Sequence, residues 1–263
     1  MLKNKVILIT GSTNGIGRAA AKRCVEQGAR VMVHGRQEDR AQALVAELGE
    51  QSAHYVIADL ENDQEAPNAL VAATVSKWGR LDGLVNNAGI YPRNTIDSVD
   101  VELYQKIMQV NFHVPLLICK AAMKPFRQQG RGAIVNIGSM NAYCGQTDLL
   151  IYSCSKGALM TMTRNLADSL GPEQVRVNQL NVGWTATENE MALKRSEGLP
   201  DNWQEKIPKV YAPSGRLLSP ENVAEHIVFW LSDRSAPVSG AVYEVEQYPI
   251  IGRNRLNDLV INE

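Results

Sequence analysis

Short runs of apolar, mostly β-branched residues alternate along this chain with longer stretches of helical spacing. The runs lack the polar–apolar alternation of a half-exposed strand, which is typical of strands buried on both faces. The pattern predicts strands at 6–10, 30–34, 54–58, 81–86, 133–137, 176–180 and 242–246. Helical stretches reach about residue 27 and then occupy 38–48, 64–78, 99–129, 152–170 and 220–231. This alternation predicts an α/β fold, with helices on both faces of a doubly wound parallel sheet of about seven strands.

The chain offers no clear boundary between domains. Its 263 residues suit one α/β domain, and no linker or fixed-period repeat interrupts the pattern. The one change in composition is the polar, proline-containing stretch 184–215, which we expect to form a mobile lid over the substrate. Residues 247–263 follow the last predicted strand as a C-terminal tail. We therefore predict a single domain, 1–263, that carries this lid and tail.

The composition argues against several classes of function. With 27 basic and 28 acidic residues the net charge is −1, and no block of Lys and Arg marks a nucleic-acid or membrane surface. No apolar stretch approaches the ~20 residues that a membrane span needs. The cysteines are scattered and form no Cys-x-x-Cys pair, which predicts neither a metal site nor a disulfide and favours the reducing cytoplasm. These cysteines are Cys24, Cys119, Cys144 and Cys154.

A glycine-rich turn, Thr10-Gly-Ser-Thr-Asn-Gly-Ile-Gly17, joins the first predicted strand to the first helix. Glycines allow backbone N–H groups to approach a phosphate closely, and the N-terminus of the following helix attracts its negative charge. Such a turn can also require glycine for its geometry alone. The strand before it and the helix after it favour the phosphate-binding interpretation.

Four further motifs follow in order. Asn86-Asn87-Ala88-Gly89 ends the fourth predicted strand, Asn111 lies in the mid-chain helix, and Ser139 ends the fifth strand. Tyr152-Ser-Cys-Ser-Lys156 opens the next helix. Together with the glycine turn, the set resembles the short-chain dehydrogenase/reductase family, whose members have a Rossmann-type fold, bind NAD or NADP and interconvert alcohols and ketones. The motifs span residues 10–187, and the strand pattern extends the match to about 246.

The resemblance implies a catalytic set of Asn111, Ser139, Tyr152 and Lys156. Tyr152 and Lys156 are four residues apart, so they share one face of the predicted helix. A tyrosine alone has a pKa near 10, and we expect the ammonium of Lys156 to lower it. In the family, the tyrosine donates a proton to the carbonyl oxygen while hydride arrives, the serine hydrogen-bonds that oxygen, and the asparagine supports a proton relay. A Tyr/Lys pair without these companions is more often a surface contact of a helix.

The cofactor preference depends on the end of the second strand, where NAD-binding folds place a carboxylate for the ribose hydroxyl. Here His34-Gly-Arg36 fills that place, and Arg36 could pair with the 2′-phosphate of NADP or remain solvated. We predict NADP (NADPH). The resemblance extends the cofactor site to Gly11, Ser12, Thr13, Asn14, Gly15, Ile16, Gly17, His34, Arg36, Asp59, Leu60, Asn87, Ala88, Gly89, Tyr152, Lys156, Gly183 and Thr185.

Two motifs depart from the family pattern at the substrate side. Val182-Gly183 replaces its Pro-Gly, and Glu246-Gln247-Tyr248 replaces its Asp-Gly-Gly. The loops expected around the substrate carry polar groups, which favour a small sugar, sugar acid or polyol over a long apolar chain. Glu190 is one such group, although Thr187-x-x-Glu190 is also a capping box, and Arg93 could be solvated. The predicted substrate residues are Tyr91, Arg93, Ser139, Asn141, Tyr143, Tyr152 and Trp184.

Two other functions stay open. A 3-oxoacyl-carrier-protein reductase would need a basic patch beside the site, and Lys124, Arg127 and Arg131 are its candidates. A catalytically silent NADP-sensing protein would not need the complete catalytic set. By resemblance we also expect a homotetramer, packed through the helices that carry Asn111 and Tyr152.

Overall fold

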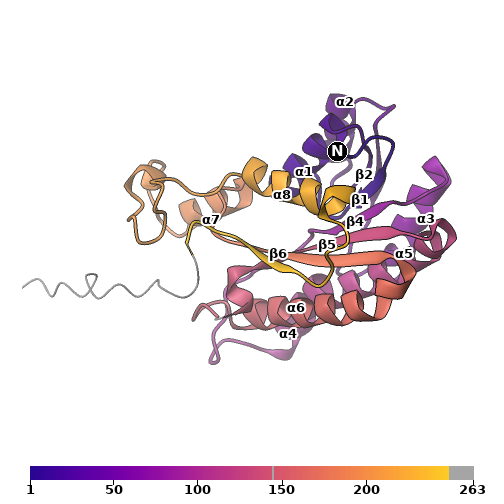
Figure 1. Ribbon diagram of the computed structural model, residues 1–263. Coiled ribbons are helices and arrows are strands. Elements are labelled where there is room, and N and C mark those ends of the chain that lie inside the picture. The colour runs from indigo at the N-terminus through magenta and orange to yellow at the C-terminus, as the bar shows by residue number, and fades with distance from the viewer. Residues whose placement is uncertain (144, 249–263) are drawn as a thin grey trace, which may run out of the picture.

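Seven parallel strands form one sheet in the order β3-β2-β1-β4-β5-β6-β7 (Figure 1). The computed structural model describes residues 1–143 and 145–248. The predicted sheet is confirmed, with strand boundaries shifted by at most two residues. The strands are β1 (Val6–Ile9), β2 (Arg30–Gly35), β3 (Ala53–Ile57), β4 (Gly83–Asn86), β5 (Gly132–Ser139), β6 (Val175–Val182) and β7 (Val242–Val245).

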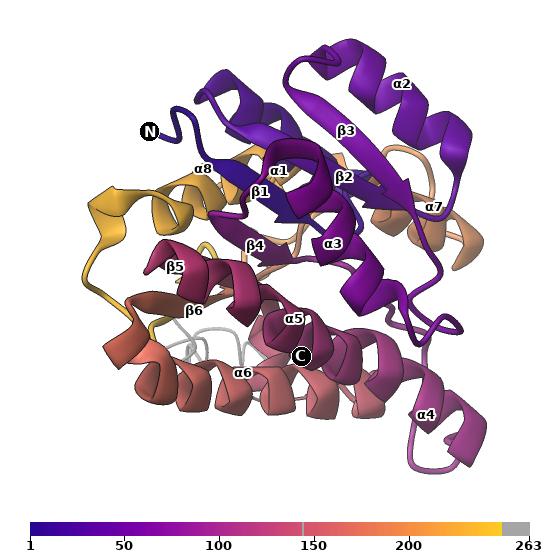
Figure 2. The same ribbon diagram turned by 90° about the vertical axis from the view of Figure 1, so that its right-hand side faces the viewer.

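Helices cover both faces of this sheet, as Figures 1 and 2 show. Successive side chains of a strand point to opposite faces. Ile7 and Ile9 therefore pack with α1, α2 and α8, whereas Leu8 packs with α3, α5 and α6. The helices are α1 (Gly15–Glu26), α2 (Glu38–Leu48), α3 (Ala66–Trp78), α4 (Val101–Met108), α5 (Val114–Gln129), α6 (Leu150–Leu170), α7 (Glu188–Ser196) and α8 (Pro220–Leu231).

The single helix predicted at 99–129 has three parts. A π-helical turn, Gln109–His113, separates α4 from α5. Such a turn takes in an extra residue and rotates the side chains that follow, so it leaves little trace in hydrophobic spacing. Asn111 lies in the middle of this turn and is completely buried. The irregular turn therefore sets the orientation of a predicted catalytic residue.

The strand order reverses between β1 and β4, which are hydrogen-bonded neighbours whose chains continue toward opposite edges. In open parallel sheets, ligands bind in the crevice at the carboxyl ends of the strands where the order reverses. The glycine turn follows β1, and Asn87 follows β4. Both motifs therefore lie at the carboxyl ends of the strands, where this architecture binds ligands.

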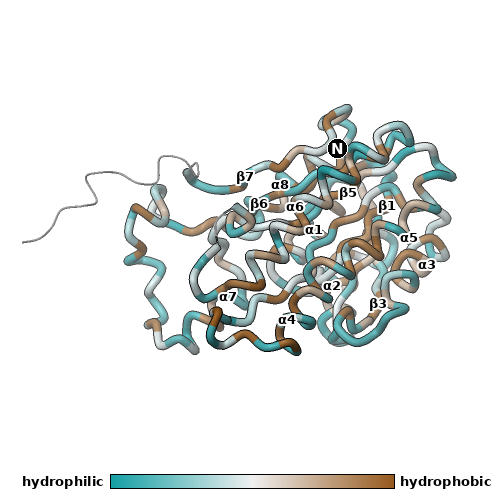
Figure 3. Tube along the Cα trace, turned by 90° about the horizontal axis from the view of Figure 1, so that it is seen from below, coloured by the Kyte–Doolittle hydropathy of each residue, from teal (hydrophilic) through white to brown (hydrophobic). Residues whose placement is uncertain are grey.

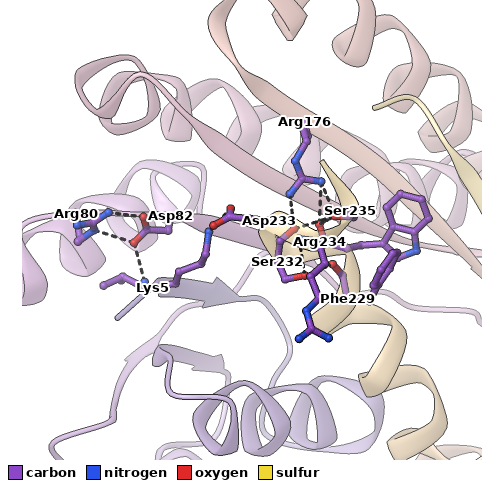
Figure 4. Close-up of polar contacts among 11 residues, drawn as sticks. Lys5, Arg80, Asp82, Arg176, Phe229, Ser232, Asp233, Arg234 and Ser235 are labelled. Atoms are coloured by element: carbon purple, nitrogen blue, oxygen red, sulfur yellow. Dashed lines mark hydrogen bonds and ion pairs between the residues drawn. The ribbon is translucent and has the colours of Figure 1, made fainter. Parts of the chain in front are cut away.

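At the amino ends of the strands lies a network of polar contacts (Figure 4). Asp82 accepts hydrogen bonds from Arg80 and from the backbone N–H of Val6, and Lys5 pairs with Asp233 at 2.6 Å. Arg176 donates to the carbonyl oxygens of Trp230, in the last turn of α8, and of Ser232, just after it. A cavity of about 380 Å³ opens at these amino ends of the strands, but none of the sequence motifs lines it.

The predicted lid begins after β6 and contains α7 and a 3₁₀ turn, Trp203–Lys206. It extends beyond the sheet (orange in Figure 1) and alternates hydrophilic and hydrophobic residues (Figure 3). Of the predicted tail, 249–263 lies outside the described residues. Over the described residues, no helix combines the length and apolar character needed to cross a bilayer.

Candidate active site

Backbone contacts hold the glycine turn against β2 and the loop after β4. Gly11 and Gly15 adopt positive φ angles of 61° and 49°, which residues with a side chain rarely do. A Cβ on Gly11 would lie 3.0 Å from the Cα of Ala88. Asn87 donates from its side-chain amide to the carbonyl oxygens of Thr10 and Gly11, at 2.9 and 3.0 Å. The turn and the Asn87 loop therefore form one rigid unit.

The helix that follows this turn is suited to an anion. Asn14 precedes α1 without capping it through its side chain, and no acidic residue occupies the first turn. The first N–H groups of a helix lack partners within the helix and carry partial positive charge. The other side chains of the turn point away from this end. Ser12 bonds to Ile9 and His34, Thr13 packs against Gly35, and Ile16 packs on the core.

His34 supports the glycine turn from inside the protein, although the sequence placed it among the cofactor contacts. Its side chain is buried, and its Nδ1 accepts the backbone N–H of Gly11 at 2.9 Å. Because Nδ1 accepts, Nε2 carries the proton and donates to the carbonyl oxygen of Ala58 at 3.2 Å. Burial lowers the pKa of His34 to about 4. A neutral imidazole therefore links β1, β2 and β3 beneath the turn.

At the end of β2, Gly35 is buried and Arg36 is exposed. In the described part of the chain, the guanidinium of Arg36 makes no ion pair. Asp59 lies within range of this charge, and its oxygens accept hydrogen bonds from Asn62 and from the backbone N–H of Glu61. These two bonds, together with Arg36, lower the pKa of Asp59. Leu60 belongs to the hydrophobic core.

The Tyr152 and Lys156 motif opens α6 beside the end of β5. Lys156 is buried, and its Nζ donates to the carbonyl oxygen of Ile137 at 2.7 Å. A Cβ on Gly89 would lie 3.6 Å from that Nζ, so Lys156 reaches the loop after β4. The Ser139 hydroxyl hydrogen-bonds Tyr152 and also accepts the backbone N–H of Asn141 at 3.2 Å. The structure thus brings Ser139, Tyr152 and Lys156 together beside Gly89.

The expectation that the ammonium of Lys156 lowers the pKa of Tyr152 was wrong. Burial raises the pKa of Tyr152, the hydrogen bond from Ser139 opposes this shift, and the charge of Glu190 adds to it. Nζ of Lys156 lies 5.7 Å from the centre of the Tyr152 ring and faces Ile137 instead. Burial also lowers the pKa of Lys156 to about 8. Burial is the largest cause of the shift at Tyr152, so its phenol stays protonated at neutral pH.

Asn111 positions the loop after β4. Its Oδ1 accepts the N–H of Ile90 at 2.8 Å, and its Nδ2 donates to the carbonyl oxygen of Ile90 and to Ser155. Through these bonds the side chain acts as a clamp between the π-helical turn, this loop and α6. The proton relay expected of Asn111 stays a prediction.

Among the predicted substrate residues, Tyr91 and Asn141 lie beside the catalytic residues and Trp184 lies against the lid, whereas Tyr143 lies toward β7. Tyr91 lies edge-on to Tyr152, with ring centres 6.0 Å apart, and Trp184 stacks on Trp203 at 5.3 Å. Burial raises the pKa of Tyr91 to about 12. Asn141 is half-buried beside Ser139. Tyr143 is exposed and lies near Asn181 and Glu244, toward β7.

Arg93 is held by two carboxylates rather than by solvent. Its guanidinium pairs with Glu197 at 2.9 Å and with Asp148 at 3.3 Å. Both partners are far from Arg93 in the sequence, so neither could be anticipated from local spacing. Arg93 therefore connects the loop after β4 to the end of α7, which leaves it less available to a substrate than the sequence suggested.

The two departures from the family pattern contact each other. The N–H of Gly183 donates to the carbonyl oxygen of Val245 at 2.9 Å, and a side chain at Gly183 would overlap the carboxylate of Glu246. The hydroxyl of Thr185 donates to the carbonyl oxygen of Gly183 at 3.0 Å. Glycine at 183 and glutamate at 246 are thus matched to each other.

Across residues 1–143 and 145–248, the structure gathers no three His, Cys, Asp or Glu side chains as a metal would require.

Comparison with known proteins gives one consistent family. The model of the short chain dehydrogenases matches residues 5–198. The chain is 35% identical to an L-rhamnose 1-dehydrogenase (NAD(P)(+)) of Azotobacter vinelandii, over 92% of this chain and 94% of that protein. It is 32% identical to a 3-oxoacyl-[acyl-carrier-protein] reductase of Aquifex aeolicus, over 93% of this chain and 96% of that protein.

Solved structures agree. A 3-ketoacyl-(acyl-carrier-protein) reductase from Brucella melitensis, complexed with NADH, superimposes with a TM-score of 0.83 at 30% identity and covers 94% of this chain and 98% of its own. The motifs, the strand order and these likenesses extend over nearly the whole chain. It belongs to the short-chain dehydrogenase/reductase family of oxidoreductases.

Proposed function

We propose that the protein interconverts a secondary alcohol and its ketone with NADP as cofactor, on a small polar substrate such as a sugar, sugar acid or polyol. The observation that carries the proposal is the grouping of Ser139, Tyr152 and Lys156 beside the Asn87–Gly89 loop. The cofactor, when bound, supplies or accepts the hydride. The chain's own residues must hold the substrate oxygen and move its proton.

Tyr152 fits the role of proton carrier. Because burial keeps its phenol protonated at neutral pH, it can donate to a ketone oxygen in the reductive direction. Ser139 reaches the Tyr152 hydroxyl and would stabilise negative charge that develops on the same oxygen. Lys156, whose pKa is lowered to about 8, can return the proton to Tyr152 between turnovers.

The residues present fit a dinucleotide with a 2′-phosphate. The space between Gly11 and Ala88 excludes a side chain, and α1 begins without an acidic residue. Gly35 would meet Thr13 if it carried a Cβ, so the end of β2 is compact, and Arg36 is exposed beside it. The guanidinium of Arg36, which makes no ion pair within residues 1–143 and 145–248, can form charge-assisted hydrogen bonds with the 2′-phosphate.

The preference for NADP is tested by Arg36→Ala. We expect the Kd for NADPH to rise roughly tenfold or more, since hydrogen bonds between charged groups are worth ~1.5–3 kcal/mol, and the Kd for NADH to stay unchanged. Arg40→Ala removes an equal charge from the exposed side of α2 and is the matched control. Equal Kd values for both cofactors in the wild type would contradict the preference.

A carrier-protein reductase is the second candidate, because two of the relatives bear that name. Two of the three basic residues offered for docking, Arg127 and Arg131, do not support it. Arg127 pairs with Glu173 at 2.6 Å near the end of α5. Arg131 directly precedes β5, at the amino ends of the strands, whereas the catalytic residues lie at the carboxyl ends. Assays with 3-oxoacyl thioesters and with sugars and polyols separate the two functions. No turnover of any of them would favour the NADP-sensing alternative.

We also propose a homotetramer packed through the helical region around Asn111 and through α6, which carries Tyr152, and the apolar surface of the adjoining α4 segment supports it. Ile96 and Val101 are 77% and 70% exposed, and Tyr104 is 48% exposed on the same segment. Apolar side chains exposed together favour an interface. Light scattering coupled to gel filtration measures the mass in solution, and a monomer mass would refute the proposal.

A further inference from the structure

Glu190 does not complete the capping box that its spacing suggests. The N–H of Glu190 donates to the hydroxyl of Thr187, which forms half of the box. The other half is missing, because the Thr187 N–H bonds to the carbonyl oxygen of Thr185. The Glu190 carboxylate instead accepts the indole N–H of Trp184 at 2.9 Å, and only 14% of its side chain is exposed. The side chain therefore serves something other than the start of the helix.

Ion pairs link Glu190 to the loop that carries Tyr91, because Lys194 lies 3.9 Å from Glu190 and 2.7 Å from Glu197, and Glu197 pairs with Arg93. Tyr91 and Tyr152 face each other edge-on, and the negative charge of Glu190 acts on both hydroxyls to raise their pKa values. Trp184, which holds the carboxylate, directly follows Gly183 at the end of β6. The first turn of α7 thus directs a buried charge toward the place where a substrate must lie to meet Tyr152.

The charges around Glu190 leave this region negative. Lys194 lies 3.9 Å from Glu190 but is closer to Glu197, at 2.7 Å. Arg93 is shared between Glu197 and Asp148. The carboxylates of Glu190, Glu197 and Asp148 therefore face only two cations, those of Lys194 and Arg93. This group of five side chains carries a net charge of one negative unit. Both cations have another carboxylate closer to them than Glu190.

We propose that Glu190 is a specificity-determining residue that selects neutral polyhydroxy substrates over those that carry a carboxylate. A carboxylate accepts several hydrogen bonds, and Trp184 supplies one of them to Oε1. Among the described residues, no hydrogen-bond donor meets Oε2, so hydroxyl groups of a sugar or polyol can do so. A substrate carboxylate in the same partly buried space would be repelled, which is selection by an unfavourable contact. The inference rests on the proposed function and narrows its substrate class.

The test is Glu190→Gln, assayed with pairs of substrates that share one carbon skeleton. Each neutral polyol or sugar is compared with the corresponding aldonate, for example glucitol with gluconate, using NADP⁺ and measuring kcat/KM. Glutamine keeps an oxygen that can accept from Trp184, so the packing of α7 is preserved. The matched control is Glu188→Gln, which removes the same charge from the exposed side of the same turn.

We expect the wild type to favour the neutral member of the pair, and Glu190→Gln to lower the neutral-to-aldonate ratio of kcat/KM by roughly tenfold, the loss of one charged hydrogen bond. Glu188→Gln should leave the ratio unchanged. If the wild type uses both members equally, or if Glu190→Gln keeps the wild-type ratio, the inference is wrong and the proposed function stands. If the wild type turns over neither member of any pair but reduces an acyl thioester, the proposed function itself is wrong.

Discussion

Replacing His34 with phenylalanine tests whether a buried imidazole supports the glycine turn. Phenylalanine keeps a ring in place but provides no partner for the N–H of Gly11 or the carbonyl oxygen of Ala58. An unsatisfied buried polar group costs ~1–3 kcal/mol. With two such groups, one of them only partly buried, the free energy of unfolding should fall by about 2–4 kcal/mol at pH 7. The turn should also bind NADPH more weakly.

The pH dependence makes this prediction specific. The pKa of His34 is lowered from its ordinary value to about 4, so the unfolded chain takes up a proton near pH 6.5 while the folded chain does not. The stability that His34 contributes is therefore complete above pH 6.5 and is lost as the pH falls toward 4, by about 1.4 kcal/mol per pH unit. The difference between wild type and His34→Phe should shrink over this interval.

Urea unfolding of both proteins, followed by circular dichroism at several pH values from 7.5 to about 4.5 where both refold, gives this difference directly. His54 and His226 also have lowered pKa values, but they are present in both proteins and cancel. A difference that stays constant with pH, or no loss of stability at pH 7, would refute the role assigned to His34.

Three further predictions concern α6 and the lid. Lys156→Met should abolish turnover yet raise Tm by a few degrees, because it removes the cost of a buried ammonium whose pKa is lowered to about 8; a lower Tm would contradict this. Since that cost is complete below pH 8 and falls as the pH rises from about 8 toward the ordinary lysine pKa of 10.5, the gain over wild type should be smaller at pH 9 than at pH 7. Trp203→Ala should raise KM by losing the stack on Trp184, and an unchanged KM would argue against a substrate contact there. Hydrogen exchange over 184–215 should slow when cofactor and substrate are both bound, whereas equal exchange would exclude a closing lid.

The fold could be predicted because each strand carries its own signal, a short apolar run bounded by turn residues. The break around Asn111 could not, because a π-helical turn changes the orientation of side chains without changing their composition. The helix α7 was also missed, since it is short, most of its residues are polar and none is buried. Its start was nevertheless visible in Thr187, which caps the helix by accepting the N–H of Glu190.

The positions of the motif residues were predictable, whereas their partners were not. His34 bonds to Ala58, 24 residues away, and Arg93 to Glu197, 104 residues away. Only the folded chain places these groups together. The protonation of Tyr152 also escaped prediction, because spacing reports that Lys156 shares its helix face but not how strongly burial acts on both groups.

We propose above that Tyr152 carries the proton in an NADP-dependent oxidation of a secondary alcohol. The most direct test of this proposal is the rate of NADPH formation by wild type and Tyr152→Phe with a neutral polyol or sugar that the wild type oxidises, alongside the Kd of each for NADPH. Since general acid–base catalysis contributes ~10²–10⁴-fold, we predict that kcat falls by at least about a hundredfold while the Kd for NADPH is nearly unchanged. A Tyr152→Phe protein that retains most of the wild-type kcat would contradict the account.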